Sequence, residues 1–501
     1  MDTPTPWRMN AQSITRCDVA IPQALKRELF AHLFPGDGEE HGAVLAAGIA
    51  MYGGTLRLLV RHVFLAREGA DYRPGRRSHR ELQPRFIADR LGFCRDHRMA
   101  YLAVHNHGGQ YSVGFSQTDL ASHERGYPTL LDLAQGLPVG ALVFAQHASA
   151  GDIWLDVNRR LPTTEVRVIG DTCERLTERP EPIPAAVALT RSMEEEGEHH
   201  RQILMLGAAG QARLRQLRVG VIGLGGVGSL IVQSLAHLGI GQLLLADPER
   251  VELSNLSRVV GARRWDARWP WSHPRMPMWV RTLAQRLSAR KTSIARRMIR
   301  RISPATRVDV YHANIAQAKI ASAFRDCDFL FLAADSAQSR LLFNALVHQY
   351  YVPGIQIGSK VVPGSDGSLQ QAFSVIRRVW PGFGCLWCAG LIPAERLAWE
   401  AKSEREQREQ HYGVTEPDPS VITLNSIGAG HAVNEFLFST LNLRMSDADT
   451  AWWARSFDHV RGRILEDHAR PDQSCSECGS SDASRLGRGD AEGLPVLGSN
   501  E

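Results

Sequence analysis

The feature that most constrains the fold is a glycine-rich turn at residues 221–228, Val-Ile-Gly-Leu-Gly-Gly-Val-Gly, which follows a short apolar run. A second apolar run at residues 242–246 ends at Asp247. This order predicts a βαβ entry into a parallel sheet that binds a nucleotide, with the phosphates at a helix N-terminus. The residues that let the backbone approach the phosphates are Gly223, Gly225, Gly226 and Gly228.

Polar residues after the second run separate this chain from redox dinucleotide-binding proteins. The segment Ser-Asn-Leu-Ser-Arg at 254–258 supplies an amide, Asn255, and a cation, Arg258, where a redox cofactor needs neither. Both groups suit the phosphates of a triphosphate. The pattern therefore favours an ATP site used for adenylation. A dehydrogenase stays the alternative for the glycine-rich turn taken alone.

Length and composition limit the other classes of function. With 501 residues, 44% of them hydrophobic, the chain is long enough for roughly two to four domains. Its net charge of +5 is small, so nucleic-acid binding is not the expected function. The sequence starts with no signal peptide, and no stretch approaches the roughly 18 apolar residues of a membrane span. We expect a soluble, cytoplasmic protein.

Turn and breaker residues divide the chain into four regions. Apolar runs at 43–47, 56–64, 99–105 and 139–146 predict strands of a compact α/β domain over residues 1–168. A Pro- and Glu-rich stretch makes residues 169–198 a linker and the start of a helix. Residues 199–479 are expected to form a Rossmann-like domain with a parallel sheet. The Gly-, Ser-, Asp- and Arg-rich residues 480–501 are expected to be a disordered tail.

An unusual insertion at residues 261–286 interrupts the second domain. It places four tryptophans among prolines and arginines: Trp265, Trp269, Trp271 and Trp279. The simplest interpretation is a surface loop that packs on its own domain. An aromatic and basic loop can instead clamp a partner or the nucleotide.

Four of the eight cysteines form two Cys-x-x-Cys pairs: Cys385, Cys388, Cys475 and Cys478. Two such pairs fit a tetrahedral Cys₄ zinc site that ties the C-terminal segment to its domain. A closed site of this kind stabilises the fold and has no open position for catalysis. Redox activity of one pair is the alternative.

Several elements in sequence order, rather than any single one, carry a family resemblance. They are His-Arg-Gln-Ile at 200–203, the glycine-rich turn, Asp247, the 254–258 segment, Lys291, Asp335 and the paired cysteines. Residues from about 199 to 478 resemble the ThiF/MoeB adenylyltransferases, which are related to ubiquitin-activating enzymes. The resemblance implies that Asp247 holds the ribose of ATP, that Asn255, Arg258 and Lys291 contact its phosphates, and that Asp335 holds Mg²⁺. Arg201 would reach into the neighbouring subunit's site in a homodimer.

The chemistry of adenylation agrees with these roles, because a carboxylate that attacks the α-phosphate meets negative charge and expels pyrophosphate. Taken singly, Lys291 could be a solvated helix residue, Asp335 a helix cap and Arg201 a surface charge. Thioester-forming relatives carry a cysteine after the first metal pair, whereas residues 389–474 contain none. The expected product is therefore an acyl-adenylate passed to another nucleophile or protein.

The first domain holds a second group of chemistry-bearing residues. His105-Asn-His107 ends an apolar strand, and Ser116-Gln-Thr-Asp119 opens a helix after a glycine-rich loop. Two histidines and a carboxylate give three of four zinc ligands and leave one position for water. The Ser-x-x-Asp pattern also fits a helix cap, and His-x-His can lie on a solvated strand.

With Glu39, which lies three residues before Gly42, this pattern resembles the JAMM, or prokaryotic JAB, metallopeptidases over about residues 22–160. The resemblance implies that His105, His107 and Asp119 bind zinc, that Glu39 is the general base, and that Ser116 stabilises the oxyanion. Glu40 is the rival for the base. Two glycines follow His107 where proline is usual in eukaryotic relatives.

The two resemblances together predict an α/β metallopeptidase domain followed by an adenylyltransferase domain, with ATP, Mg²⁺, a catalytic zinc and a structural zinc. A partner with an extended C-terminus, such as a ubiquitin-like or sulfur-carrier protein, would serve both domains. Adenylation of a short peptide or small carboxylic acid is the second hypothesis. A nucleotide-binding scaffold with inactive sites is the third.

Overall fold

The computed structural model describes residues 13–73, 80–179, 197–364, 366, 368–402, 419–445 and 452–496. Two compact units divide the chain. The first unit comprises Met1–Pro182 and two short later pieces, Gln349–Tyr351 and Ala483–Gly493. The second unit takes the rest of the chain. Most of the expected linker, residues 180–196, lies outside the described residues.

The first unit is built on one sheet of eight strands in the order β1-β3-β2-β4-β5-β6-β7-β8. The sheet closes on itself, because β1 pairs with β3 and also with β7. The strands are β1 (Arg16–Pro22), β2 (Gly42–Tyr52), β3 (Thr55–Leu65), β4 (Ala100–Asn106), β5 (Val139–Phe144), β6 (Ser149–Asp156), β7 (Arg159–Ile169) and β8 (Glu174–Leu176). The four apolar runs that predicted strands fall on β2, β3, β4 and β5.

The described residues of this unit also form three helices: α2 (Gln23–Leu33), α3 (Pro84–Asp96) and α4 (Gln117–Leu133). Buried Val, Leu and Ala side chains from β2, β3 and β4 form the centre of its core. Strand β4 runs between β2 and β5 and brings its last residues, His105 and Asn106, to the end of the sheet where α4 begins. The core thus fixes the strand end on which the first candidate site depends.

The second unit combines a Rossmann-like half with an antiparallel extension in one sheet, ordered β11-β10-β9-β12-β13-β14-β15-β16. The strands are β9 (Arg218–Ile222), β10 (Gln242–Ala246), β11 (Arg307–Tyr311), β12 (Phe329–Leu332), β13 (Gly354–Pro363), β14 (Leu369–Val379), β15 (Trp452–Asp458) and β16 (Arg463–His468). The strands from β11 to β13 are parallel to one another. The strands β14, β15 and β16 continue the sheet as antiparallel neighbours. The parallel sheet predicted from the sequence thus corresponds to β9–β13, and the sequence did not predict the antiparallel strands.

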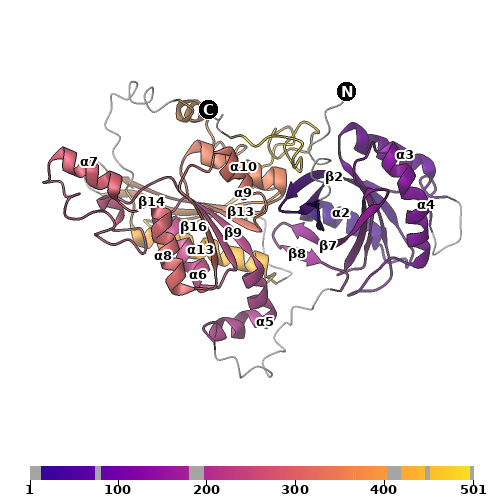
Figure 1. Cartoon of the computed structure of the whole chain (residues 1–501), viewed down its shortest axis with the longest axis horizontal. Coiled ribbons are helices and arrows are strands. Elements are labelled where there is room, and N and C mark those ends of the chain that lie inside the picture. Colours follow the sequence, from indigo (N-terminus) through magenta and orange to yellow (C-terminus); the bar gives the residue numbers. More distant parts are fainter. Residues whose placement is uncertain are drawn as a thin grey trace. The chain divides into compact units, whose positions relative to one another are not determined.

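Helices cover both faces of this sheet (Figure 1). They are α5 (His200–Gln216), α6 (Gly226–His237), α7 (Met278–Leu287), α8 (Lys291–Ile302), α9 (Ala318–Ala323), α10 (Ala337–Tyr350), α11 (Ala394–Glu400) and α13 (Ile422–Thr440), with a 3₁₀ turn, η2 (Leu253–Asn255). Helix α6 packs against α8 and α13, and α9 and α10 lie on the opposite side of the sheet (Figure 1). None of the described helices has the length and apolar character to cross a bilayer.

Residues near the C-terminus return to the first unit. The backbone of Gly489 forms a parallel bridge with Ile49 on β2, and the Asp490 carboxylate accepts a hydrogen bond of 2.7 Å from the Met51 N–H. Buried Gln349 donates to the carbonyls of Gly489 and Glu492. A disordered tail was expected over residues 480–501, whereas the described part of it, up to residue 496, contains this paired segment. Backbone pairing needs no bulky side chains, which explains why composition did not indicate it.

Candidate active sites

The glycine-rich turn connects β9 to α6 and lies against the end of β12. Gly223 has a φ of +89°, and a Cβ atom there would lie 2.8 Å from the Ala333 carbonyl carbon. A Cβ on Gly228 would lie 1.9 Å from the Gly223 oxygen. Both positions therefore require glycine for the tight packing of the turn. Gly225 caps α6 and has open space around it.

The Asp247 carboxylate lies beneath this turn at the end of β10. It is 5% exposed and accepts hydrogen bonds from the Leu224 N–H at 2.7 Å and the Glu249 N–H at 2.8 Å. Burial raises the pKa of Asp247, although the nearby Lys291 and both hydrogen bonds act in the opposite direction. The structure thus brings together two predicted parts of the ATP site, the glycine-rich turn and Asp247.

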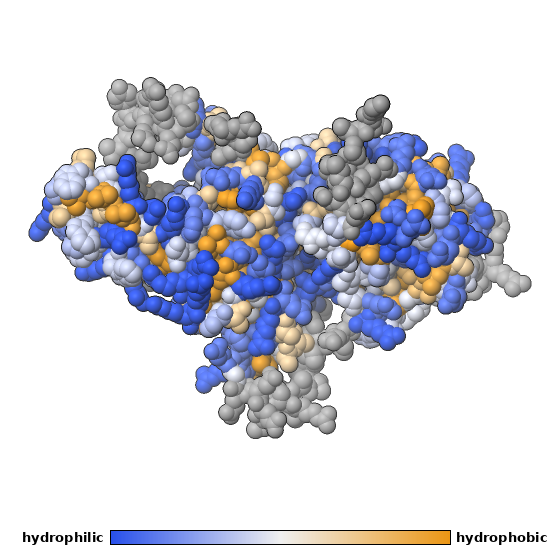
Figure 2. Space-filling view, in the orientation of Figure 1, coloured by the Kyte–Doolittle hydropathy of each residue, from blue (hydrophilic) through white to orange (hydrophobic). Residues whose placement is uncertain are grey.

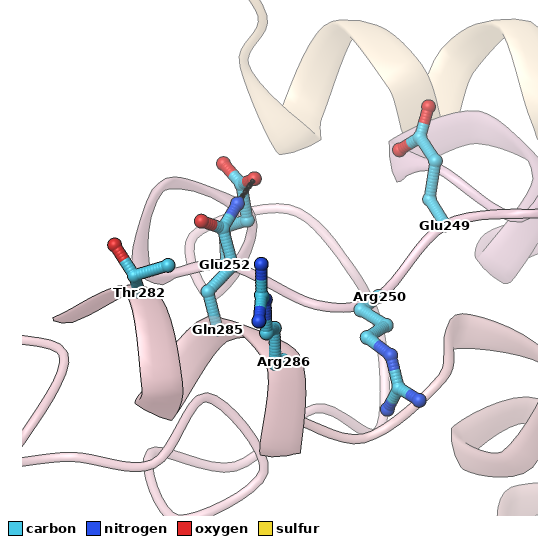
Figure 3. A pocket seen from close by; sticks show the side chains of 6 residues that line it. All are labelled: Glu249, Arg250, Glu252, Thr282, Gln285 and Arg286. Carbon is cyan, nitrogen blue, oxygen red and sulfur yellow. Dashed lines mark hydrogen bonds between the residues drawn. The ribbon is translucent and has the colours of Figure 1, made fainter. Parts of the chain in front are cut away.

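Lys291 opens α8 and is buried. Its ammonium group donates to the Glu249 carboxylate, whose side chain is 65% exposed. Beside this pair lies a cavity of about 490 Å³ lined by Glu249, Arg250, Glu252, Thr282, Gln285 and Arg286. Its wall combines the loop after β10 with α7, and Gln285 donates to Glu252 across it at 2.6 Å (Figure 3). Lys291 is thus a buried cation beside a cavity, with an exposed carboxylate as its partner.

Asn255 ends the η2 turn, and Arg258 follows three residues later and lies near Gly226. A Cβ on Gly226 would lie 2.4 Å from Asn425 Nδ2 and 3.3 Å from Arg258 Cδ. Asn255 is buried, and its side chain accepts a hydrogen bond from the Glu252 N–H, which closes the turn. Asn425 on α13 also accepts from the Ser359 hydroxyl at 3.2 Å. Sequence reasoning missed Asn425, because α13 carries several polar residues and only the fold places this amide beside Gly226.

Two predicted residues lie apart from these contacts. Asp335 is exposed three residues after the end of β12, where the loop is next to Gly223 through Ala333. Arg201 is exposed on the first turn of α5. In the described part of the chain, neither side chain makes a hydrogen bond or ion pair with the other predicted ATP-site residues.

The four paired cysteines converge in the second unit. Their four Sγ atoms lie within 4.8 Å of one another, in Cys385, Cys388, Cys475 and Cys478. Cys388 Sγ is 3.6 Å from Cys478 Sγ. Ligands of one tetrahedral zinc with bonds of about 2.3 Å lie about 3.8 Å apart, so the cluster fits zinc.

Asn344 on α10 supports this cluster from outside. It donates to Cys385 Sγ at 3.6 Å and accepts from the Leu386 N–H. A hydrogen bond with Cys478 lowers the pKa of Cys385, which favours its thiolate, the form that binds metal. Sequence reasoning missed Asn344, because only the fold places it beside the cysteines.

The first unit brings together a second cluster. His105 Nε2 lies 3.1 Å from His107 Nε2, and Asp119 Oδ2 lies 3.7 Å from the first and 3.5 Å from the second. Nitrogen and oxygen ligands of one tetrahedral zinc lie about 3.4 Å apart when each bond is about 2.1 Å. The three side chains therefore fit zinc. The Gly114 carbonyl lies 3.1 Å from His107 Nδ1 and orients the ring.

Ser116 and Asp119 also form a helix cap. The Ser116 hydroxyl donates to Asp119 Oδ2 at 2.7 Å and accepts from the Asp119 N–H, a capping box at the start of α4. Burial acts to raise the pKa of Asp119, but hydrogen bonds from His105, His107 and Ser116 outweigh it and hold the pKa far below its usual value. The capping interpretation and the ligand interpretation are thus both compatible with one geometry.

The segment that carries Glu39 and Glu40 is tied to the His-x-His strand by Asn106. The Asn106 amide donates to the Glu39 carbonyl at 3.2 Å and accepts from the His41 N–H at 2.6 Å. Glu40 Oε1 lies 3.8 Å from His107 Nε2, and Glu39 Oε2 lies 3.9 Å from Arg80 Nε. Sequence reasoning gave Asn106 no role, although its amide binds the backbone on both sides of Glu40.

Fold and side chains together define a mixed α/β protein with a Rossmann-like domain and a separate unit that holds a His/His/Asp cluster. Residues 199–446 match the model of the ThiF family. This stretch of the chain is a ThiF-family domain.

Several proteins with similar sequences are named as adenylyltransferases. The sulfur carrier protein adenylyltransferase of Thermus thermophilus is 28% identical over 153 residues, which are 30% of this chain and 49% of the relative. The sulfur carrier protein ThiS adenylyltransferase of Bacillus subtilis is 28% identical over 183 residues, 34% of this chain and 49% of the relative. The chain therefore spans about half the length of these relatives. A crystal structure of E. coli MccB with MccA-N7isoASN aligns with 57% of this chain and 76% of that chain, at a TM-score of 0.43 and 17% identity.

Proposed function

We propose that the second unit adenylates the C-terminal carboxylate of a ubiquitin-like or sulfur-carrier protein with ATP. The observation that carries this proposal is the ThiF-family match over the residues in which Asp247, the glycine-rich turn, Lys291 and Arg258 meet. The names of the relatives support the class of partner, since they refer to sulfur carrier proteins.

In this proposal each side chain has one task. Asp247 accepts the ribose hydroxyls, and the N-terminus of α6 faces the phosphates. Lys291 exchanges its Glu249 partner for a phosphate, and Arg258 and Asn255 hold the remaining oxygens. Asp335 holds Mg²⁺, which neutralises triphosphate charge when bound. Catalysis then rests on positioning and on stabilisation of the charge at the α-phosphate.

Pyrophosphate exchange tests this proposal. Purified protein with Mg²⁺ and ATP should exchange labelled pyrophosphate only when a ubiquitin-like protein ending in Gly-Gly is present. Asp335→Ala should abolish exchange without a change in melting temperature, since Asp335 is exposed. Exchange with a short peptide or small carboxylic acid alone would replace the protein partner by that substrate. ATP binding without any exchange would make the unit a scaffold.

The role of Arg201 depends on a homodimer, because its side chain does not meet the other ATP-site residues within the described chain. We propose that it reaches the ATP site of a second copy. Arg201→Ala should then lower exchange by about a thousandfold. Sedimentation of the wild type as a monomer at assay concentrations would remove this role.

We further propose that the first unit is a zinc peptidase that cleaves a peptide or isopeptide bond at the same partner's C-terminus. The observation that favours it is the convergence of His105, His107 and Asp119. Zinc, when bound, acts as a Lewis acid toward the scissile carbonyl. Glu39 takes the proton from the attacking water, with Glu40 as the rival, and Ser116 donates to the oxyanion.

Metal content and cleavage together test the peptidase. The wild type should contain two zinc ions per chain by elemental analysis. His107→Ala should lose one and Cys388→Ser the other, and only His107→Ala should abolish cleavage of a ubiquitin-like fusion. Glu39→Gln and Glu40→Gln should both keep zinc, so the one that abolishes cleavage is the base. Full cleavage by His107→Ala would refute the peptidase proposal.

A further inference from the structure

A strong positive charge is concentrated in one short part of the second unit. Residues 261–302 contain eleven arginines and one lysine but a single carboxylate, Asp266. That carboxylate is already bound by Arg297 through two hydrogen bonds of 2.8 and 2.6 Å. Lys291 is bound by Glu249. Although the net charge of the whole chain is only +5, residues 261–302 therefore carry an excess of positive charge that nearby carboxylates do not neutralise.

The exposed face of α8 forms the centre of this excess. Arg296, Arg300 and Arg301 are exposed, and none of them pairs with a carboxylate in the part of the chain that the structure describes. With Arg297, Ser293 and His312 they line a cavity of about 420 Å³ beside the edge strand β11. Residues 296 and 300 lie one turn apart, which repeats a guanidinium about every 6 Å along the helix. Hydrophilic side chains dominate the surface over α8 in Figure 2.

Among the described residues, the groups around His312 show that positive charge near α8 is not balanced by carboxylates. Burial lowers the pKa of His312, and Arg290, Arg250 and Arg296 lower it further. The Arg290 and Arg250 guanidiniums donate to backbone carbonyls, of His312 and Ser288. Thr292 shares a hydrogen bond with the His312 ring. The groups facing His312 from α8 and from the loops around it are thus cationic or neutral.

One exposed aromatic ring lies next to an arginine of this cavity, and further exposed rings lie on the same tryptophan-rich segment. Arg297 lies 6.0 Å from the ring centroid of Trp265 and donates to the Gly261 carbonyl, so it joins the arginine cavity to the tryptophan-rich segment. Trp265 is 58% exposed, and Trp271 and Trp279 are 55% and 72% exposed. Buried Asp266 and Ala267 anchor the segment, so the rings are held on the surface.

We propose that α8 and the tryptophan-rich segment bind single-stranded nucleic acid. Phosphates would lie along the α8 arginines, and unpaired bases would stack on Trp265 and the other exposed indoles. Stacking on aromatic rings beside a basic groove is how proteins bind single strands with little sequence preference. An acidic protein would satisfy the arginines but would leave the indoles without flat partners. This function is separate from adenylation and from peptide cleavage, and it differs from the expectation drawn from net charge.

Fluorescence anisotropy of the full-length protein tests the proposal, with labelled RNA and DNA single strands of about 16 nucleotides. Binding is expected at about 50 mM salt and should weaken steeply by about 200 mM. The combined variant Arg296→Gln, Arg300→Gln and Arg301→Gln should lower the log–log salt slope by about two, and Trp265→Ala should weaken binding about tenfold. Arg27→Gln, Arg85→Gln and Arg125→Gln remove three exposed arginines of the first unit as the matched control and should bind normally.

Three results would overturn the proposal. The first is an absence of binding by the wild type at low salt. The second is equal weakening by the α8 variant and its control. The third is full displacement by polyglutamate together with wild-type affinity of Trp265→Ala, which would assign the surface to an acidic protein instead. Circular dichroism melting of each variant separates lost binding from lost folding.

Discussion

At the scale of single residues, two glycines of the same turn differ sharply in what surrounds them. Gly228 faces the Gly223 oxygen, which an added Cβ would approach to 1.9 Å, while Gly225 faces open space. The first glycine therefore serves the packing of the turn, and the second is free to serve a ligand.

Gly228→Ala should destabilise the second unit, because the clashing atom belongs to the backbone and cannot rotate away. We expect a loss of about 3 kcal/mol, or about 6–12 °C in melting temperature. Gly225→Ala is the matched control and should melt like the wild type. If Gly225→Ala weakens ATP binding at unchanged stability, the turn lies against the phosphates. Equal melting temperatures for both variants would contradict the packing argument.

His431 on α13 links stability to pH. Its ring packs against Phe457 at 4.8 Å, and burial, with help from Arg455 and Arg444, lowers its pKa to about 4. In the unfolded chain the pKa of histidine is about 6.5. Between these values the unfolded chain binds a proton that the folded chain does not, so acidification favours unfolding.

His431→Phe should therefore reduce the loss of stability between pH 7 and pH 5. The ring is partly exposed and screened, so we expect a difference of about 1 kcal/mol, or about 2–4 °C in melting temperature. Thermal melts of wild type and variant at both pH values measure it. Parallel pH dependence of the two proteins would show that His431 does not contribute.

At the scale of elements, strand β4 does more than present its histidines. Asn106 holds the segment of Glu39 and Glu40 through both polar atoms of its amide: the nitrogen donates to the Glu39 carbonyl and the oxygen accepts from the His41 N–H. Asn106→Ala should leave zinc binding intact, because His105 and His107 are untouched, but should lower kcat for cleavage by about tenfold or more through misplacement of the base. A variant that loses zinc, or one with normal kcat, would contradict this positioning role.

Elements with strong local patterns could be predicted, and those made by long-range pairing could not. The run at 242–246 coincides with β10, because parallel strands buried on both faces are continuously apolar. Strand β16 is exposed along its whole length, so no hydrophobic pattern marked it. Likewise, Asn106, Asn344 and Asn425 act through tertiary contacts, while the spacing of the histidines, Asp119 and the cysteines already indicated the two clusters that the structure brings together.

At the scale of the whole molecule, the C-terminal segment Ala483–Gly493 belongs to the first unit. A chain that ends at Asp482 should lose protection in the last residues of β2, which extend beyond its pairing with β4, because Asp490 no longer accepts from the Met51 N–H. Hydrogen–deuterium exchange of peptides covering Met51 should then be faster. A chain that ends at Val496 is the matched control. Identical exchange in both truncations would show that the segment adds nothing to the first unit.

This return of the chain sets an order for biogenesis. The ribosome adds Pro182 long before Ala483, because roughly 300 residues, mostly of the second unit, are synthesised between them. At usual elongation rates this takes about 15–60 s. During that interval the last residues of β2 in the nascent first unit lack the backbone partner that Gly489 and Asp490 later provide. A message truncated within the second unit thus yields an incomplete first unit, which ties the quality of one half of the protein to full translation of the other.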